Sequence, residues 1–118
     1  MILVCVINAA NRFHGRGSLK QVYAGGKTVR GPMIALKFKP NDRRPAYRCA
    51  VVVSRRVHKS AVARNRIRRR VYEQVRSHAK QLASPYDMVF TVFDERIKDM
   101  PSQELATDIQ ALLHQAHI

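Results

Sequence analysis

The chain has 118 residues, with 22 Lys or Arg against 8 Asp or Glu, which leaves a net charge of +14 at pH 7. This length favours a single domain, and a hydrophobic content of 46% excludes a wholly disordered chain. No apolar run reaches the roughly 18 residues of a membrane-spanning helix, and the short apolar start at 1–7 lacks the charge and cleavage pattern of a secretory signal.

The N-terminal third of the chain predicts a short helix followed by two strands. The helix is expected over 19–24, because a serine precedes it as a candidate N-cap and two glycines follow it. A short strand is expected at 28–29, just before a Gly-Pro break. The run 33–39 predicts a stronger strand, because every second position is apolar. These apolar positions are Ile34, Leu36 and Phe38.

The middle of the chain predicts a strand and a long helix. The apolar run 49–53 indicates a strand over 47–54 that is covered on both faces. Ser60 is positioned to cap a helix over 61–82, which Ser84 and Pro85 end. On this helix an apolar residue recurs every four positions and forms a narrow stripe. The stripe consists of Ile67, Val71, Val75 and Ala79, with Leu82 extending it.

The last third predicts a strand over 86–93, a loop over 94–100 and a final helix that Pro101 and Ser102 open. The apolar face of that helix contains Leu105, Ile109, Leu112 and Leu113.

The order of these elements predicts the fold. A strand, a long helix and a second strand form a crossover unit, so strands 47–54 and 86–93 are expected to be parallel. Strands 33–39 and 47–54 are joined by a short turn and are expected to be antiparallel. The sequence therefore predicts a mixed four-stranded sheet with helices packed against it, a two-layer α+β sandwich formed by one domain over 12–118. Residues 1–11 are expected to be an N-terminal extension.

The two cysteines, Cys5 and Cys49, are far apart and form no CxxC pair. Their number and spacing exclude a disulfide scaffold and a zinc ribbon. We interpret each of them as a small buried hydrophobic residue, which fits a reducing, cytoplasmic location.

The charge is concentrated in one part of the chain. Residues 1–80 hold 20 Lys or Arg against only Asp42 and Glu73, a net charge of +18, whereas residues 81–118 carry a net charge of −4. Such an asymmetry favours a polyanionic partner, and nucleic acid is the common one in cells. An anionic membrane surface is less favoured, because the basic helix lacks the broad apolar face of interfacial helices.

The segment 55–70 carries eight cations and no anion. Like charges three and four residues apart destabilise a helix, and a solvated helix face would alternate in sign instead. A polyanion would supply the missing counter-charge. By helical spacing Arg64 falls on the apolar stripe, so it avoids burial only if the start of the helix extends past the sheet. Arg64, Asn65 and Arg68 would then surround a helix N-terminus that favours phosphate.

The sequence from Ser54 to Arg69 resembles the signature of the bacterial ribonuclease P protein subunit. The matching parts are Ser54-Arg-Arg-Val and Arg64-Asn-Arg-Ile-Arg-Arg, and the resemblance extends over roughly 12–116. It implies a sheet like that of domain 2 of ribosomal protein S5. It also implies a ribonucleoprotein that removes the 5′ leader of precursor tRNA, with the magnesium-dependent chemistry carried out by the RNA and Mg²⁺ held mainly there.

The resemblance assigns two binding surfaces. The basic helix and its connector would bind the catalytic RNA through Arg55, Arg56, Lys59, Arg64, Asn65, Arg66, Arg68 and Arg69. A cleft beside the sheet would bind the leader through Arg12, Phe13, Leu19, Tyr23 and Lys37. Leu19 and Lys37 stand where the family often has aromatic residues, which predicts weaker stacking of the leader or a phosphate contact by Lys37. The apolar start departs from the family's polar arm, and an extension or a misassigned start codon would each account for it.

The residue content gives no nuclease site within the protein itself. Protein nucleases commonly use carboxylate clusters that hold metals, or paired histidines. The carboxylates Asp94, Glu95 and Asp99 lie in the anionic third, so an ordinary polar loop is expected there. We therefore predict no catalytic residue and no metal ligand, and no obligate protein partner. The alternatives are a structural RNA-binding protein of ribosomal type and, less favoured, an autonomous nuclease or DNA-binding protein.

Overall fold

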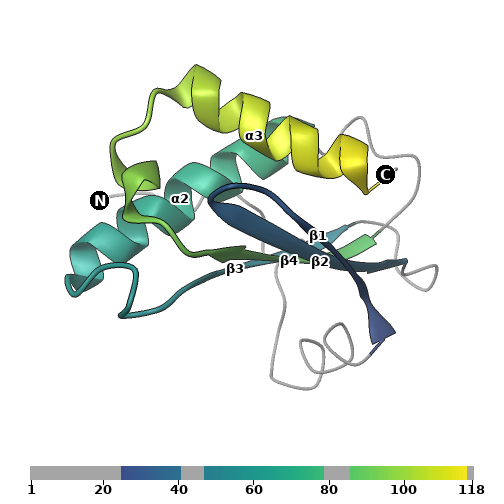
Figure 1. The fold of residues 1–118 in the computed structure, drawn as a ribbon, viewed down its shortest axis with the longest axis horizontal. Helices are drawn as coiled ribbons and strands as arrows, with labels where there is room; N and C mark the ends of the chain where they lie inside the picture. The colour runs from purple at the N-terminus through teal and green to yellow at the C-terminus, as the bar shows by residue number, and fades with distance from the viewer. Residues whose placement is uncertain (1–24, 41–46, 79–85, 117–118) are drawn as a thin grey trace.

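The computed structural model describes residues 25–40, 47–78 and 86–116 (Figure 1). Their elements, in chain order, are β1 (Lys27–Arg30), β2 (Ile34–Pro40), β3 (Arg48–Val53), α2 (Ala61–His78), β4 (Tyr86–Val92), the 3₁₀ helix η3 (Glu95–Lys98) and α3 (Ser102–Gln115). The extension expected at 1–11, the short helix expected over 19–24 and the last turn predicted for the long helix lie outside the described residues.

The four strands form one mixed sheet in the order β1-β2-β4-β3. Strand β4 pairs with β3 in parallel and with β2 antiparallel, so the predicted crossover unit is confirmed. Strands β2 and β3 run in opposite directions, as expected, but β4 lies between them. The central position of β4 agrees with its burial, because Met88, Val89 and Phe90 are all fully buried.

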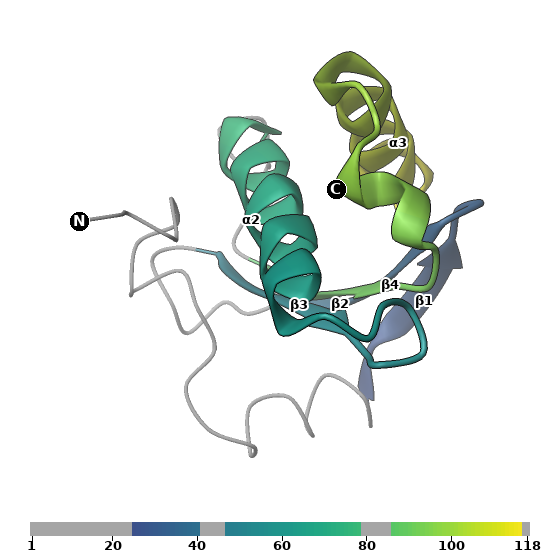
Figure 2. The ribbon, with the colours of Figure 1, turned by 90° about the vertical axis from the view of Figure 1, so that its left-hand side faces the viewer.

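Helices α2 and α3 pack side by side on the same face of the sheet (Figure 2). The apolar stripe of α2 is confirmed at Ile67, Val71 and Val75, which are buried, and Ala63 joins it at its start. Ala79 and Leu82, the last two predicted members, lie outside the described residues. The apolar face of α3 is confirmed as predicted, since Leu105, Ile109, Leu112 and Leu113 are buried. These side chains meet the inward-facing residues of the sheet in one core, which fixes how α2 is held above it.

Two expectations about the fold need correction. Strand β3 was expected to be covered on both faces, but Ala50 and Val52 are partly exposed, because α2 and α3 cover only the face that carries Cys49, Val51 and Val53. The loop expected over 94–100 contains the helix η3. Its one buried residue, Ile97, reaches the core, and a single apolar residue in a polar segment gives no periodic signal in the sequence.

Strand β3 carries polar partners on its outer edge and at its start. The Val51 amide, on the edge away from β4, donates to the Tyr72 hydroxyl at 3.3 Å. At the start of the strand, Arg48 forms a two-pronged ion pair with Asp87, its register partner on β4, over 2.9 Å and 2.7 Å. The two side chains are only 5% and 8% exposed, so this pair lies in the folded interior. Among the described residues, no helix combines the length and hydrophobicity needed to cross a membrane.

Candidate nucleic-acid interface

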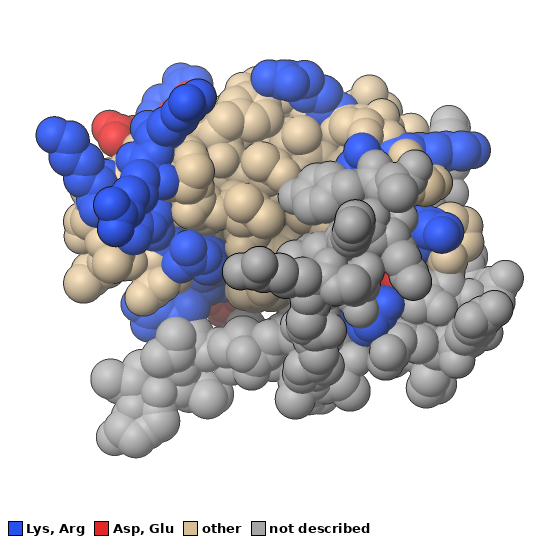
Figure 3. All heavy atoms as spheres, turned by 90° about the horizontal axis from the view of Figure 1, so that it is seen from below, with Lys and Arg blue, Asp and Glu red and all other residues tan. Residues whose placement is uncertain are grey.

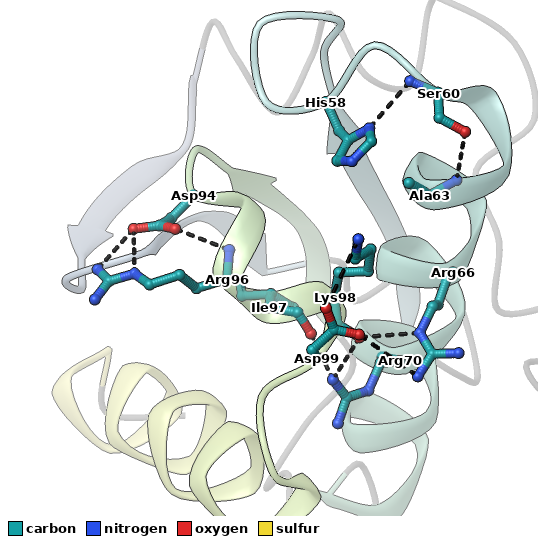
Figure 4. A network of polar contacts seen from close by, with 10 residues as sticks. All are labelled: His58, Ser60, Ala63, Arg66, Arg70, Asp94, Arg96, Ile97, Lys98 and Asp99. Atoms are coloured by element: carbon teal, nitrogen blue, oxygen red, sulfur yellow. Dashed lines mark hydrogen bonds and ion pairs between the residues drawn. The ribbon is translucent and has the colours of Figure 1, made fainter.

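The residues of the basic segment meet at one end of the sheet. Strands β3 and β4 are parallel and end together, with Val53 opposite Val92, and the connector 54–60 leads directly into α2. Ser60 caps α2, because its hydroxyl accepts the Ala63 amide at 3.3 Å and its carbonyl accepts the Arg64 amide at 3.0 Å. The Ser60 amide in turn donates to Nδ1 of His58 at 3.0 Å (Figure 4). The connector is therefore fixed against the start of the helix.

Arg64 avoids burial by turning back onto this connector. Its Nη1 donates to the carbonyl oxygens of His58 and Lys59 at 3.0 Å and 2.8 Å. Arg64 is half-buried, and the neighbouring Ala63 occupies the stripe in its place. The guanidinium thus gains neutral acceptors and keeps its net charge, which is what a phosphate-binding side chain needs.

Asn65 and Arg68 form a pair on the next turn. Nη1 of Arg68 donates to Oδ1 of Asn65 at 2.6 Å, and its Nη2 lies 3.5 Å from the carbonyl oxygen of Val53 at the end of β3. Asn65 is exposed and Arg68 is half-exposed. The amide therefore orients the guanidinium at the border between helix and sheet without neutralising it.

Arg66 and Arg70 point to a different place, the carbonyl end of η3. Nε of Arg66 and Nη1 of Arg70 both donate to the carbonyl oxygen of Lys98, each at 3.0 Å (Figure 4). Arg70 also donates to the carbonyl oxygens of Ile97 and Met100. The sequence interpretation gave Arg66 an RNA-binding role and gave Arg70 none. Both anchor η3 to α2, and the sequence carries no signal for this because η3 itself gives none.

The other cations of the segment have no carboxylate partner among the described residues. Arg55, Arg56 and Lys59 are exposed, and Arg69 is half-exposed with its Nε buried and without a hydrogen-bond partner. Across residues 25–40, 47–78 and 86–116, none of these four, nor Arg64 or Arg68, lies within 4.0 Å of a carboxylate. Arg66 comes only to 4.0 Å of Asp99, and both side chains are exposed. Figure 3 shows Lys and Arg side chains gathered at the left end of the molecule, where α2 begins.

The predicted leader-binding residues are described only in part. Lys37 lies on β2 between Thr28 and Val89, half-buried, on the face of the sheet opposite α2 and α3. Arg12, Phe13, Leu19 and Tyr23 lie outside the described residues.

The acidic part of the chain forms a separate region beside η3 and α3. A cavity of about 760 Å³ there is lined by both signs of charge, including Glu95, Asp99, Glu104 and Asp108. Asp94 caps η3, and hydrogen bonds from the side chain and backbone of Arg96 lower the pKa of its carboxyl. Within the described part of the chain, no three His, Cys, Asp or Glu side chains are grouped so that they could hold a metal ion. The acidic groups of this region meet the basic segment only at Arg66 and Asp99 among the described residues. We call the remaining cations of the connector and of the start of α2 the cation-rich end: Arg55, Arg56, Lys59, Arg64, Arg68 and Arg69.

Comparisons with known proteins identify a family whose sequences resemble this chain. A family model described as Ribonuclease P matches residues 7–117. The ribonuclease P protein component of Chloroflexus aurantiacus is 44% identical over 107 residues, covering 91% of this chain and 78% of that protein. That of Roseiflexus castenholzii is 37% identical over 99 residues, covering 84% and 80%.

Solved structures agree on the fold. The RNase P protein of Staphylococcus aureus superposes with a TM-score of 0.77 at 22% identity, covering 90% of this chain and 94% of that one. The protein of Thermotoga maritima gives a TM-score of 0.77 at 20% identity, covering 88% and 96%. The predicted two-layer α+β architecture is therefore shared with these proteins.

Proposed function

Because the chain belongs to the ribonuclease P protein family, whose members partner the ribonuclease P RNA, we propose that its cation-rich end binds that RNA. The observation that supports this most is the absence of carboxylate partners around Arg55, Arg56, Lys59, Arg64, Arg68 and Arg69 within the described residues. A set of guanidinium groups held by neutral acceptors keeps its full charge for phosphate, and guanidinium–phosphate contacts are strong and directional.

The individual contributions follow from the contacts. Arg55, Arg56 and Lys59 project from the connector and supply long-range attraction. Arg64 and Arg68 are oriented by the connector carbonyls and by Asn65, so they lose less conformational entropy when they bind. Arg66 donates one hydrogen bond to the Lys98 carbonyl oxygen at η3, and its side chain is still 57% exposed, so it can also contact RNA.

The chemistry of leader removal is proposed to reside in the RNA. Guanidinium and ammonium groups offer no lone pairs to a divalent cation, so the protein surface at this end does not suit Mg²⁺. Magnesium would therefore be held mainly by the RNA and would supply the hydrolytic chemistry there. The role of the protein is to bind, orient and partly neutralise the RNA around that centre.

The precursor tRNA is the proposed substrate, and its single-stranded 5′ leader is proposed to bind at the sheet. The face opposite α2 and α3 supports this, because Lys37 lies on it. Arg12, Phe13, Leu19 and Tyr23 remain predicted leader contacts. The cytoplasm is the proposed compartment, since tRNA precursors of bacteria are made there. The alternative of a ribosomal-type RNA-binding protein is not favoured, because the relatives are ribonuclease P protein components.

A reconstitution tests the proposal. The purified chain is added to a bacterial ribonuclease P RNA and a precursor tRNA at a low magnesium concentration, and leader removal is followed with time. We expect the chain to raise the cleavage rate, and no increase would refute the cofactor role. The same chain without the RNA is the control, and cleavage in that tube would instead indicate an autonomous nuclease.

A further inference from the structure

An exposed aromatic ring lies at the cation-rich end of the sheet and has no assigned role. Phe93 follows directly after β4 and is 38% exposed. The guanidinium carbon of Arg30, the last residue of β1, lies 4.7 Å from the centroid of its ring. Scattered exposed hydrophobic residues are common on protein surfaces, so exposure alone carries no argument. The significance of this ring comes instead from where it lies in the sheet and from the contacts that hold its backbone there.

The strand register places the ring between the two surfaces proposed above. Val92 pairs with Val53, so Phe93 leaves β4 at the same end of the sheet at which the connector with Arg55 and Arg56 leaves β3. Directly paired residues share a face of the sheet, and the row Arg30, Ala35, Thr91 and Val52 lies opposite α2 and α3, on the face that also carries Lys37. Phe93 therefore stands where the leader-binding face meets the cation-rich end.

The backbone that carries both residues is held in place before any ligand arrives. The Phe93 amide donates to the Met33 carbonyl oxygen at 3.0 Å, which continues the β2–β4 pairing. The Gly31 amide donates to the Ile34 carbonyl oxygen at 2.8 Å and closes the tight β1–β2 turn that holds Arg30. A side chain at Gly31 would come within 3.1 Å of that same oxygen, so the turn favours glycine.

The charge around the ring suits an anionic ligand. The carboxylate next to Phe93 along the chain is that of Asp94, which already accepts two hydrogen bonds from the Arg96 guanidinium at 2.9 Å and 2.7 Å. Arg30 is exposed and carries no ion pair with any described residue. The guanidinium lies over one face of the ring, so a nucleobase can stack on the surface of this pair that stays exposed, while its phosphate binds the guanidinium by charge.

We propose that Phe93 and Arg30 form a stacking site for one unpaired nucleotide of RNA. The site rests on the proposed function and adds a contact between the two surfaces already described. The nucleotide comes either from the precursor tRNA leader or from an unpaired segment of the ribonuclease P RNA, and the two arms of the test below separate these sources.

The chain contains no tryptophan, so Phe93→Trp introduces a single indole at the site. Its fluorescence is measured while a short single-stranded RNA oligonucleotide is added, and an abasic oligonucleotide of the same length is the control. Stacking predicts saturable quenching by the RNA that contains bases and little change with the abasic one. Equal quenching by both oligonucleotides, or none by either, would overturn the proposal.

The affinity measurements use Phe93→Leu, which keeps an apolar side chain of similar size, alongside Phe93→Tyr, which keeps an aromatic ring. One arm measures binding to the ribonuclease P RNA alone; the other compares precursor with mature tRNA on the reconstituted complex. Phe93→Leu should weaken binding about 5- to 150-fold in one arm, the range of a single base stack, and Phe93→Tyr should retain most of the affinity. Wild-type affinity of Phe93→Leu in both arms would contradict the site.

Charge is controlled by comparing Arg30→Gln with Lys27→Gln, an exposed cation on the same strand whose register partner, Phe38, faces the core. Both variants lose one charge, so a direct contact of Arg30 with the nucleotide should make Arg30→Gln bind RNA more weakly than Lys27→Gln. If the two variants bind RNA equally, Arg30 makes no contact with the nucleotide beyond its general charge. If the wild-type chain itself fails to bind the ribonuclease P RNA, the proposed function fails, whereas normal wild-type binding with an unaffected Phe93→Leu refutes this site alone.

Discussion

Arg70 and Lys98 are joined by a hydrogen bond of 3.0 Å between the guanidinium Nη1 and the backbone carbonyl oxygen, across 28 residues of chain. With Ile97 and Met100 also accepting from Arg70, one side chain on α2 satisfies three carbonyl groups around η3. The arginines of α2 therefore serve two purposes. Arg70 holds η3 against α2, whereas the cations nearer the start of the helix are the ones proposed to bind RNA.

The first prediction concerns the contrast between Arg70 and the exposed cations nearer the start of α2. Arg70→Ala should lower the free energy of unfolding by about 1–3 kcal/mol, because it leaves partly buried carbonyl groups without a donor. Arg56→Ala removes an exposed cation that makes no such contact with the described residues, so it should change the free energy of unfolding by less than about 0.5 kcal/mol. Chemical denaturation measures both. Equal stabilities of the two variants would show that the contacts of Arg70 are not structural.

The second prediction concerns salt. The affinity for ribonuclease P RNA should fall steeply with salt, because binding releases counterions from phosphate. Replacing Arg55 and Arg56 together by alanine should reduce the slope of log affinity against log salt by about 0.7–0.9 for each phosphate that the variant no longer neutralises. Arg96→Ala is the matched control, since Arg96 is exposed but already paired with Asp94. A slope that changes as much in the control would contradict the assigned surface.

The third prediction concerns Asn65 and Arg68. A double-mutant cycle with Asn65→Ala and Arg68→Ala, measured on RNA affinity, should give a coupling energy of about 0.5–1.5 kcal/mol, because the amide orients the guanidinium. Asn65→Asp should weaken RNA binding further while leaving stability intact, since the carboxylate would neutralise Arg68 and repel phosphate. Additive single effects would mean that the two side chains act independently.

The fourth prediction concerns the buried ion pair between Arg48 and Asp87. Asp87→Ala should destabilise the fold by about 3–5 kcal/mol, because it leaves a buried guanidinium without its carboxylate. Replacing both residues by apolar ones, Arg48→Met with Asp87→Leu, should cost much less. Thermal unfolding distinguishes these outcomes, and a double variant as unstable as Asp87→Ala would show that the charged pair itself is required.

The fifth prediction concerns pH. Hydrogen bonds from Arg96 lower the folded-state pKa of Asp94, so the carboxylate stabilises the fold above its ordinary pKa of about 3.9, and this contribution is lost as the pH falls through the lowered value. Asp94→Ala should lower the unfolding midpoint by roughly 2–4 °C at pH 7. The difference from wild type should shrink as the pH falls through the lowered pKa of Asp94. A difference that stays unchanged as the pH falls through that value would exclude the carboxylate as its cause.

Hydrophobic spacing made most of the fold predictable. The stripe of Ile67, Val71 and Val75 and the face of Leu105, Ile109 and Leu112 are long periodic signals, and the structure contains both. The position of β4 between β2 and β3 was not predicted, because local patterns do not state which strands pair. The helix η3 was not predicted either, because it depends on one buried residue, Ile97, and on arginine side chains from α2.

The candidate site was predictable in composition and less so in arrangement. The density of arginine in 55–70 is enough by itself to indicate a polyanionic partner. It does not indicate that Arg70 turns inward to η3, or that Arg64 turns back to the connector, because both depend on carbonyl groups that tertiary packing brings near. The Arg30 and Phe93 pair was not predicted either, since the two residues are distant in sequence and meet only through the sheet register.

The contact between Tyr72 and Val51 has a consequence for self-association. An outer strand with unpaired amide and carbonyl groups is a template on which another polypeptide can add a strand, and that addition is a common start of aggregation. Here the Tyr72 hydroxyl accepts a hydrogen bond from the Val51 amide, and Nη2 of Arg68 lies near the Val53 carbonyl oxygen. Among the described residues, side chains of α2 thereby occupy two backbone polar groups on this edge of β3, which leaves fewer groups on which a second copy could add a strand.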